Sequence, residues 1–137
     1  GLPSWLEEWR AAGRLVGPVA RQAAMRAYVL HRVNRLATAR AAAMADGGAP
    51  GPEGSIAKLR GVAAFKARAY LGKDLEGAAG MLSDSPGHLE FLTAPSMSIR
   101  GGTDEVQRNI VGERILSLPG EPRVDKDVAY CDLRKSR

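Results

Sequence analysis

Apolar side chains recur along much of this chain at the spacing of amphipathic helices. After Gly17, four of them follow one another at intervals of four, four and three residues, and Pro18 stands where a first helical turn tolerates proline. They are Met25, Val29, Val33 and Leu36. The pattern predicts a long amphipathic helix that ends before the turn-rich segment 46–54.

A second helix is predicted directly after that segment. Ser55 is a candidate N-cap, and Gly72 is a candidate stop signal. Between them, an apolar face is expected from Ile56, Leu59, Val62, Ala63 and Tyr70. The segment "LEGAAGML" that follows allows a brief return to helix.

A short helix is predicted at the start of the chain. Ser4 and Glu7 have the spacing of a capping box, and Gly13 marks an end. Trp5 and Trp9 are four residues apart and therefore share one face. We expect them to cover the edge of the core, although paired aromatic residues also occur at interfaces with other domains or subunits.

The final helix is predicted from Thr103 to about Ser117. A short helix at 88–94 precedes it, and Pro95 is expected to break the chain between them. The final helix has an apolar stripe that we expect to be buried, formed by Val106, Ile110, Val111 and Ile115. With few aromatic and β-branched runs, the chain is predicted to be all-α: a helical bundle over residues 1–120 and a mixed-charge tail over 121–137.

The formal charge of +5 is compatible with several anionic partners. The arginines of the long helix are spread over several faces, so a solvated surface is favoured over a nucleic-acid site; they are Arg21, Arg26, Arg32, Arg35 and Arg40. His31 has no second ligand at metal-binding spacing, so no metal site is expected.

The single Cys131 suits a reducing compartment, and the sequence shows neither a membrane-spanning run nor a secretory signal. A cytoplasmic location without membrane or nucleic-acid partners is expected.

Two glycines precede the final helix. Gly101 and Gly102 remove side-chain bulk in front of a helix start that Thr103 can cap. Such a start can seat a phosphate, but Asp104 and Glu105 place negative charge beside it. On this physics alone, capping is favoured over ligand binding.

The longer string "GGTDEVQRNIVGERILSLPGEPR" closely resembles the C-terminal signature of the acyl-CoA dehydrogenase family. "GPVARQAAMRAYV" and "PEGSIAKL" resemble the starts of two earlier helices of that family, in the same order. The resemblance covers nearly the whole chain but only about the C-terminal third of a typical member. It implies a helical bundle that helps to bind FAD, forms subunit interfaces, and belongs to an enzyme that removes hydrogen from the α and β carbons of acyl-CoA thioesters.

The resemblance also assigns individual residues. Thr103 and Glu105 match FAD-contacting positions, Gly102 matches a position beside the substrate thioester, and Asp104 lies between the two FAD contacts. Gly101 occupies the place where many members have the catalytic glutamate, so no catalytic residue is expected in this chain. Some branches carry that base on an earlier helix and show Gly-Gly-Thr here. "AYLGKDLEGAAG" lacks the glutamine with which many members hold FAD, so it supplies no contact.

The leading hypothesis is therefore the C-terminal domain of an FAD-dependent acyl-CoA dehydrogenase, cut from a longer chain and inactive alone. A variant of this hypothesis is a non-catalytic subunit of a heteromeric enzyme, as in some steroid-degrading members. Either version implies a homo- or hetero-oligomer. The alternative from another class is a small basic helical protein that binds nucleic acid or a protein partner.

Overall fold

The computed structural model describes residues 1–45, 51–120, 122, 128, 129 and 131 of the chain. In those residues the fold is all-α, as predicted, and no strand occurs. Five α-helices and two 3-10 helices follow one another in the order α1 (Ser4–Ala11), α2 (Gly17–Ala45), α3 (Glu53–Glu76), η1 (Gly77–Met81), α4 (His88–Thr93), η2 (Ala94–Ser98) and α5 (Asp104–Arg114).

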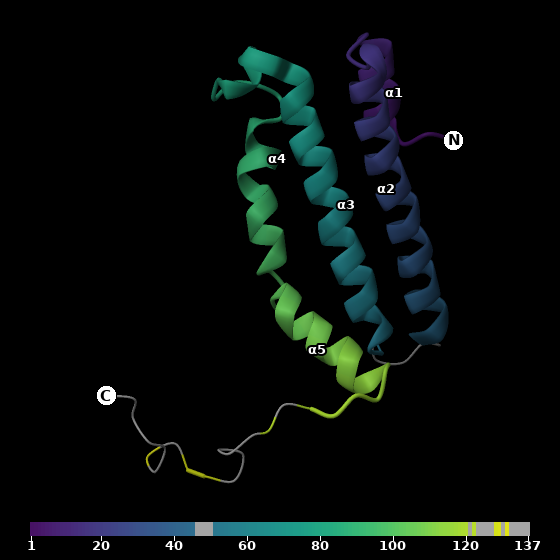
Figure 1. Ribbon diagram of the computed structural model, residues 1–137, viewed down its shortest axis with the longest axis vertical. Coiled ribbons are helices and arrows are strands. Elements are labelled where there is room, and N and C mark those ends of the chain that lie inside the picture. The colour runs from purple at the N-terminus through teal and green to yellow at the C-terminus, as the bar shows by residue number, and fades with distance from the viewer. Residues whose placement is uncertain (46–50, 121, 123–127, 130, 132–137) are drawn as a thin grey trace.

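Helix α3 is the central element. The chain descends through α2, returns through α3 and descends again through α4, η2 and α5, which lie along the other side of α3 (Figure 1). Helix α1 lies beside the start of α2. The predicted pair of long helices with one medium helix and shorter ones is confirmed.

The main apolar cluster joins α1, α2 and α3. Its buried members are Leu6, Ala24, Ala27 and Leu71, and Trp5 and Trp9 pack against it with ring centroids 4.9 Å apart. The tryptophans thus cover the edge of the core, which was the favoured interpretation. Gly72 is also buried here, with Trp9 Cζ2 only 3.3 Å from the position that a Cβ would take.

The prediction that Gly72 ends the second helix is therefore wrong. This glycine lies inside α3, where Trp9 packs closely against it, and the helix continues to Glu76. The end comes at Gly77, which has φ +56°, a conformation that glycine adopts without steric cost.

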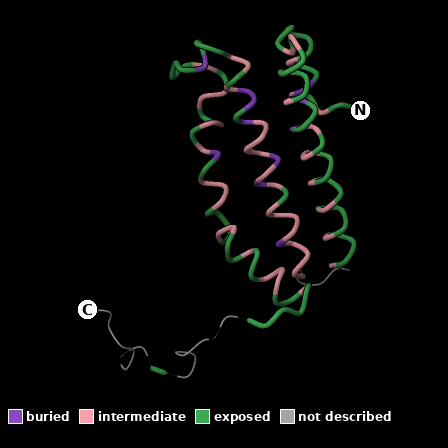
Figure 2. The backbone as a smooth tube through the Cα atoms, viewed as in Figure 1, coloured by how far each residue is buried: buried purple, intermediate pink, exposed green. Residues whose placement is uncertain are grey.

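The apolar stripe of α2, defined as Met25, Val29, Val33 and Leu36, faces away from the core. Its side chains are between 38% and 66% exposed. The face that packs on α3 instead contains small residues, and Gly61 of α3 lies opposite Asn34. Small side chains let the two helix axes approach, and the larger apolar ones remain outside. Figure 2 shows that most residues of α2 are exposed.

Both predicted serine caps are wrong. Pro3 is the N-cap of α1, Ser4 is its first residue, and no side chain caps this helix. In α3, Pro52 already has helical angles, with φ −62° and ψ −15°, so the helix begins before Ser55. Ser55 is instead buried in the first turn.

The last helix begins where predicted and ends sooner. Thr103 is its N-cap, and the helix stops at Arg114 rather than near Ser117, which has φ +54°. The stripe expected to be buried is not, because α5 has no buried residue and Val106 is 49% exposed. The short helix before it is confirmed as α4, whereas Pro95 lies within η2 rather than in a break.

The described residues contain no helix with the length and apolar character needed to cross a membrane. Nor do they contain a group of three potential metal ligands among histidine, cysteine and acidic side chains. The five arginines of α2 are exposed, as predicted. Most of the tail predicted over 121–137 lies outside the described residues, so the division at residue 120 stays a prediction.

Candidate functional site

The site predicted from the sequence is the turn between η2 and α5. Gly101 has φ +64° and Gly102 has φ +87°, so both occupy left-handed conformations that disfavour other residues. Open space surrounds the position of a Gly101 Cβ, whereas a Gly102 Cβ would meet Gln107 Nε2 at 2.7 Å. Both glycines are exposed. The backbone itself therefore forms the surface in front of α5.

Thr103 closes the turn as a true N-cap. Its backbone is extended, with φ −66° and ψ 160°, and its hydroxyl accepts a hydrogen bond from the Val106 amide at 3.2 Å. Gln107 donates its side-chain amide to the Gly101 carbonyl at 3.0 Å. The first-turn amides of Asp104 and Glu105 have no carbonyl one turn earlier within the helix, so the start of α5 retains donors and the positive end of the helix dipole.

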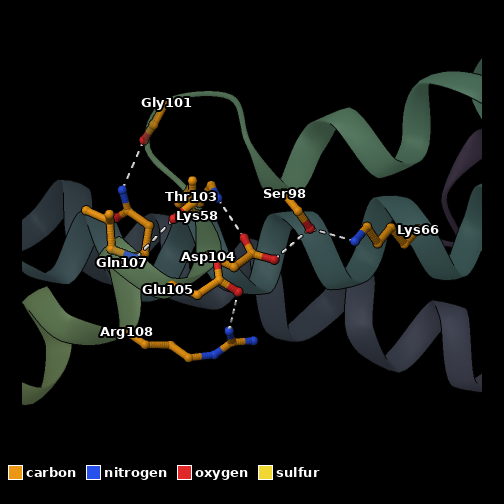
Figure 3. Close-up of polar contacts among 10 residues, drawn as sticks. Lys58, Lys66, Ser98, Gly101, Thr103, Asp104, Glu105, Gln107 and Arg108 are labelled. Carbon is orange, nitrogen blue, oxygen red and sulfur yellow. Dashed lines mark hydrogen bonds and ion pairs between the residues drawn. The ribbon is translucent and has the colours of Figure 1, made fainter. Parts of the chain in front are cut away.

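Asp104 points back toward α3 and away from the open side of the turn (Figure 3). Its Oδ1 accepts a hydrogen bond from Lys58 Nζ at 2.6 Å, and its Oδ2 accepts one from Ser98 Oγ at 2.7 Å. These hydrogen bonds, from Lys58 first and Ser98 second, lower the pKa of the Asp104 carboxyl below its ordinary value. The negative charge expected to oppose an anion at this helix start is therefore largely compensated.

Glu105 is placed differently. Its side chain is 77% exposed and lies 3.4 Å from Arg108 across one turn of α5. A pair this exposed is weak, so the Glu105 carboxylate remains available to other partners. The site residues Gly102, Thr103 and Glu105 thus lie on one short segment, in which Gly102 and Glu105 are exposed and Thr103 is half-buried.

No side chain in this turn is suited to abstract a proton. Gly101 has none, and the lowered pKa of Asp104 makes its carboxylate a poor base. Glu105 faces solvent beside Arg108. That Gly101 marks an absent base stays a prediction.

A groove of about 560 Å³ opens next to the turn, between α3 and α5. Apolar residues of both helices form much of its wall, and Lys66, Asp104 and Arg108 contribute polar groups. The groove continues from the start of α5 along α3, so a ligand held at the turn would find further surface beside it.

Lys58, Lys66 and Ser98 were not predicted from the sequence. Lys58 lies within "PEGSIAKL", but 46 residues separate it from Asp104, and no local pattern indicates such a pairing. Lys66 donates to Ser98 Oγ at 2.5 Å and extends the same network. Only the antiparallel course of α3 and α5 brings these residues together.

Comparison with known proteins agrees with the sequence resemblance. Residues 4–116 match the family model described as "Acyl-CoA dehydrogenase, C-terminal domain". No curated protein and no solved structure matches the chain. The family match extends from α1 through α5 and includes the whole Gly-Gly-Thr turn. The chain therefore belongs to the acyl-CoA dehydrogenase family, whose C-terminal domain it contains.

Proposed function

We propose that this domain supplies FAD contacts and a subunit interface to an enzyme that dehydrogenates acyl-CoA thioesters. The observation that carries the proposal is the start of α5, where two exposed glycines with positive φ precede a capped helix turn. The carboxylate nearest that turn is held by Lys58 and Ser98. This combination leaves amide donors open to an anionic or electron-rich group.

The residues present fit FAD. The Thr103 hydroxyl accepts from Val106, so its own proton remains available for a phosphate oxygen. The exposed Glu105 carboxylate can accept from a hydroxyl or amino group of the cofactor. When bound, FAD accepts the hydride that leaves the β carbon of the thioester. Gly102 would allow the thioester end of the substrate to approach the backbone closely.

FAD titration tests this proposal directly. In the purified chain, binding is followed by the fluorescence of added FAD, and Thr103→Val is expected to weaken it by about tenfold, the effect of losing one hydrogen bond to a charged group. Thr38→Val makes the same change at an exposed position on α2 and is expected to have no effect. Equal affinity of both variants would contradict a cofactor contact at Thr103.

We also propose that the chain alone does not turn over acyl-CoA, because its turn lacks a proton-abstracting side chain. The measurement is dye reduction by the purified chain with FAD and acyl-CoA substrates of several lengths. Acyl-dependent reduction of the dye would overturn this part of the proposal. Co-purification with a second, glutamate-bearing dehydrogenase subunit would instead support the heteromeric variant.

The exposed α2 stripe is our candidate for the subunit interface. Four large apolar side chains in one row are costly to leave in water and suit a protein partner. Two members of the row, Val33 and Leu36, also line a groove of about 370 Å³ that extends to Ile115 of α5. Val29→Glu is expected to shift the sedimentation coefficient toward that of the monomer. Thr38→Glu, which adds the same charge at an exposed position on the opposite face of α2, should leave it unchanged.

A further inference from the structure

Four polar side chains link the two ends of the turn to the central helix. We call them the Asp104 network: Lys58 and Lys66 on α3, Ser98 at the end of η2, and Asp104 at the start of α5. The Ser98–Asp104 hydrogen bond closes the segment 99–103, which contains both glycines. Figure 3 shows the chain of contacts running from Lys66 through Ser98 and Asp104 to Lys58.

The direction of each hydrogen bond in this network is determined by its donors. Ser98 has one proton, and Lys66 can only donate, so Lys66 fills an acceptor site of the hydroxyl and leaves the proton for Asp104. Lys58 takes the other oxygen of Asp104. Both carboxylate oxygens are therefore engaged from different elements, which fixes the rotation of the Asp104 side chain as well as its position.

The other side-chain hydrogen bonds of the turn, from Gln107 to the Gly101 carbonyl and from the Val106 amide to Thr103, are local and do not reach α3. Two consecutive glycines with positive φ give the backbone more freedom than any other pair of residues would. Helix α5 has no buried side chain that could anchor its start against α3. By contrast, the Lys58 and Asp104 side chains are only 19% and 14% exposed. Charge-assisted hydrogen bonds are strong between side chains that are this far from water.

We propose that Asp104 is a positioning residue, which holds the Gly102–Thr103 backbone in the geometry required by the ligand of this turn. It acts through Lys58 and Ser98 and does not itself contact the ligand, because its carboxylate faces α3. The part of this inference that concerns FAD rests on the proposed function. The part that concerns the order of the turn does not, since it follows from the contacts alone.

The test compares Asp104→Asn with Asp84→Asn, a matched change at an exposed loop position. Two quantities are measured on the full 137-residue chain: amide hydrogen exchange at Val106 and Gln107 without ligand, and the dissociation constant of FAD. Asp104→Asn is expected to speed exchange and to weaken FAD binding by about tenfold each, since it removes a charge-assisted bond. Asp84→Asn is expected to change neither.

A second variant separates positioning from general loss of structure. Lys58→Met is expected to resemble Asp104→Asn, and the double variant should be little worse than either single one, because both changes disrupt the same contact. Additive effects would overturn the proposal, as would exchange rates of Asp104→Asn equal to those of the unchanged chain. If the unchanged chain binds no FAD while Asp104→Asn still speeds exchange, the proposed function fails and the positioning of the turn by Asp104 stands.

Discussion

Helix α3 is held on its two sides by different forces. On the α1–α2 side, Leu6, Ala24, Ala27 and Leu71 form an apolar cluster covered by two tryptophans. On the α5 side, no side chain of α5 is buried, and Lys58 reaches across to Asp104. Apolar burial is non-directional and independent of pH, whereas a hydrogen-bonded ion pair specifies geometry and depends on the charges of both partners. The candidate cofactor contacts lie on the second side, so local geometry at the site can change while the core remains folded.

The largest effect is expected from the apolar side. Leu71→Ala should lower the free energy of unfolding by about 2–5 kcal/mol, because the side chain is 6% exposed and its removal leaves a cavity. Urea unfolding followed by circular dichroism measures this. Leu89→Ala, at a position 72% exposed, serves as the control and should change stability little. A small effect of Leu71→Ala would mean that the apolar cluster is not the main source of stability.

Alanine substitution of either glycine is expected to have a smaller effect, confined to the stability of the turn before α5. Alanine in a left-handed conformation costs about 1–2 kcal/mol. Gly102→Ala should cost more than Gly101→Ala, because its Cβ would also displace the Gln107 side chain from the Gly101 carbonyl. Amide exchange in the first turn of α5 measures both. Equal effects would show that the Gln107 contact adds nothing to the turn.

Low pH should weaken the contacts that Asp104 makes between the start of α5 and α3. The pKa of Asp104 is lowered by its hydrogen bonds from Lys58 and Ser98, so the folded chain binds the proton less readily than the unfolded chain. The stabilisation is therefore present above the ordinary value of 3.8 and is lost as pH falls through the lowered pKa. Faster exchange at the Val106 amide below that pH is expected, and Asp104→Asn should abolish the pH dependence. If the pH dependence of exchange persists in Asp104→Asn, a group other than Asp104 causes it.

The smallest effect is expected on the α1–α2 side, at a higher pH. Burial lowers the pKa of His31, and the charges of Arg35, Arg32 and Arg68 lower it further. Because the unfolded chain then binds a proton more readily, stability should decrease as pH falls below 6.5 and level off below the lowered pKa. Thermal unfolding of the chain and of His31→Gln across this range measures the difference. Identical pH profiles would exclude His31 as the source.

Local patterns predicted the helices better than they predicted which faces those helices bury. The extent of α2 and the cap at Thr103 followed from residues that act within one or two turns. The α5 stripe was expected to be buried, yet α5 has no buried residue and Val106 is 49% exposed. Hydrophobic periodicity indicates that a face suits burial, but it does not say whether the covering surface belongs to the same chain.

The roles of the glycines were likewise predicted correctly only where those roles are local. Gly72 has the sequence properties of a stop signal, but it lies inside a continuous helix and is buried against Trp9. Gly101 and Gly102 were correctly expected to open the backbone before α5, because no partner from elsewhere is needed for a left-handed turn. A glycine that serves the local backbone is thus predictable, and one that makes room for a distant side chain is not.

The sequence by itself determined the helical class of this protein, the family to which it belongs, and the glycine-rich start of its last helix. These depend on helical periodicity, on residue order within short motifs, and on the conformational freedom of glycine. Only the tertiary structure decided that Lys58 and Ser98 hydrogen-bond Asp104, that the large apolar residues of α2 face outward, and that α5 contacts α3 without burying a residue of its own. Those outcomes depend on contacts between residues far apart in the sequence, such as Lys58 and Asp104, and the path of α5 past α3 alone places them within hydrogen-bonding distance.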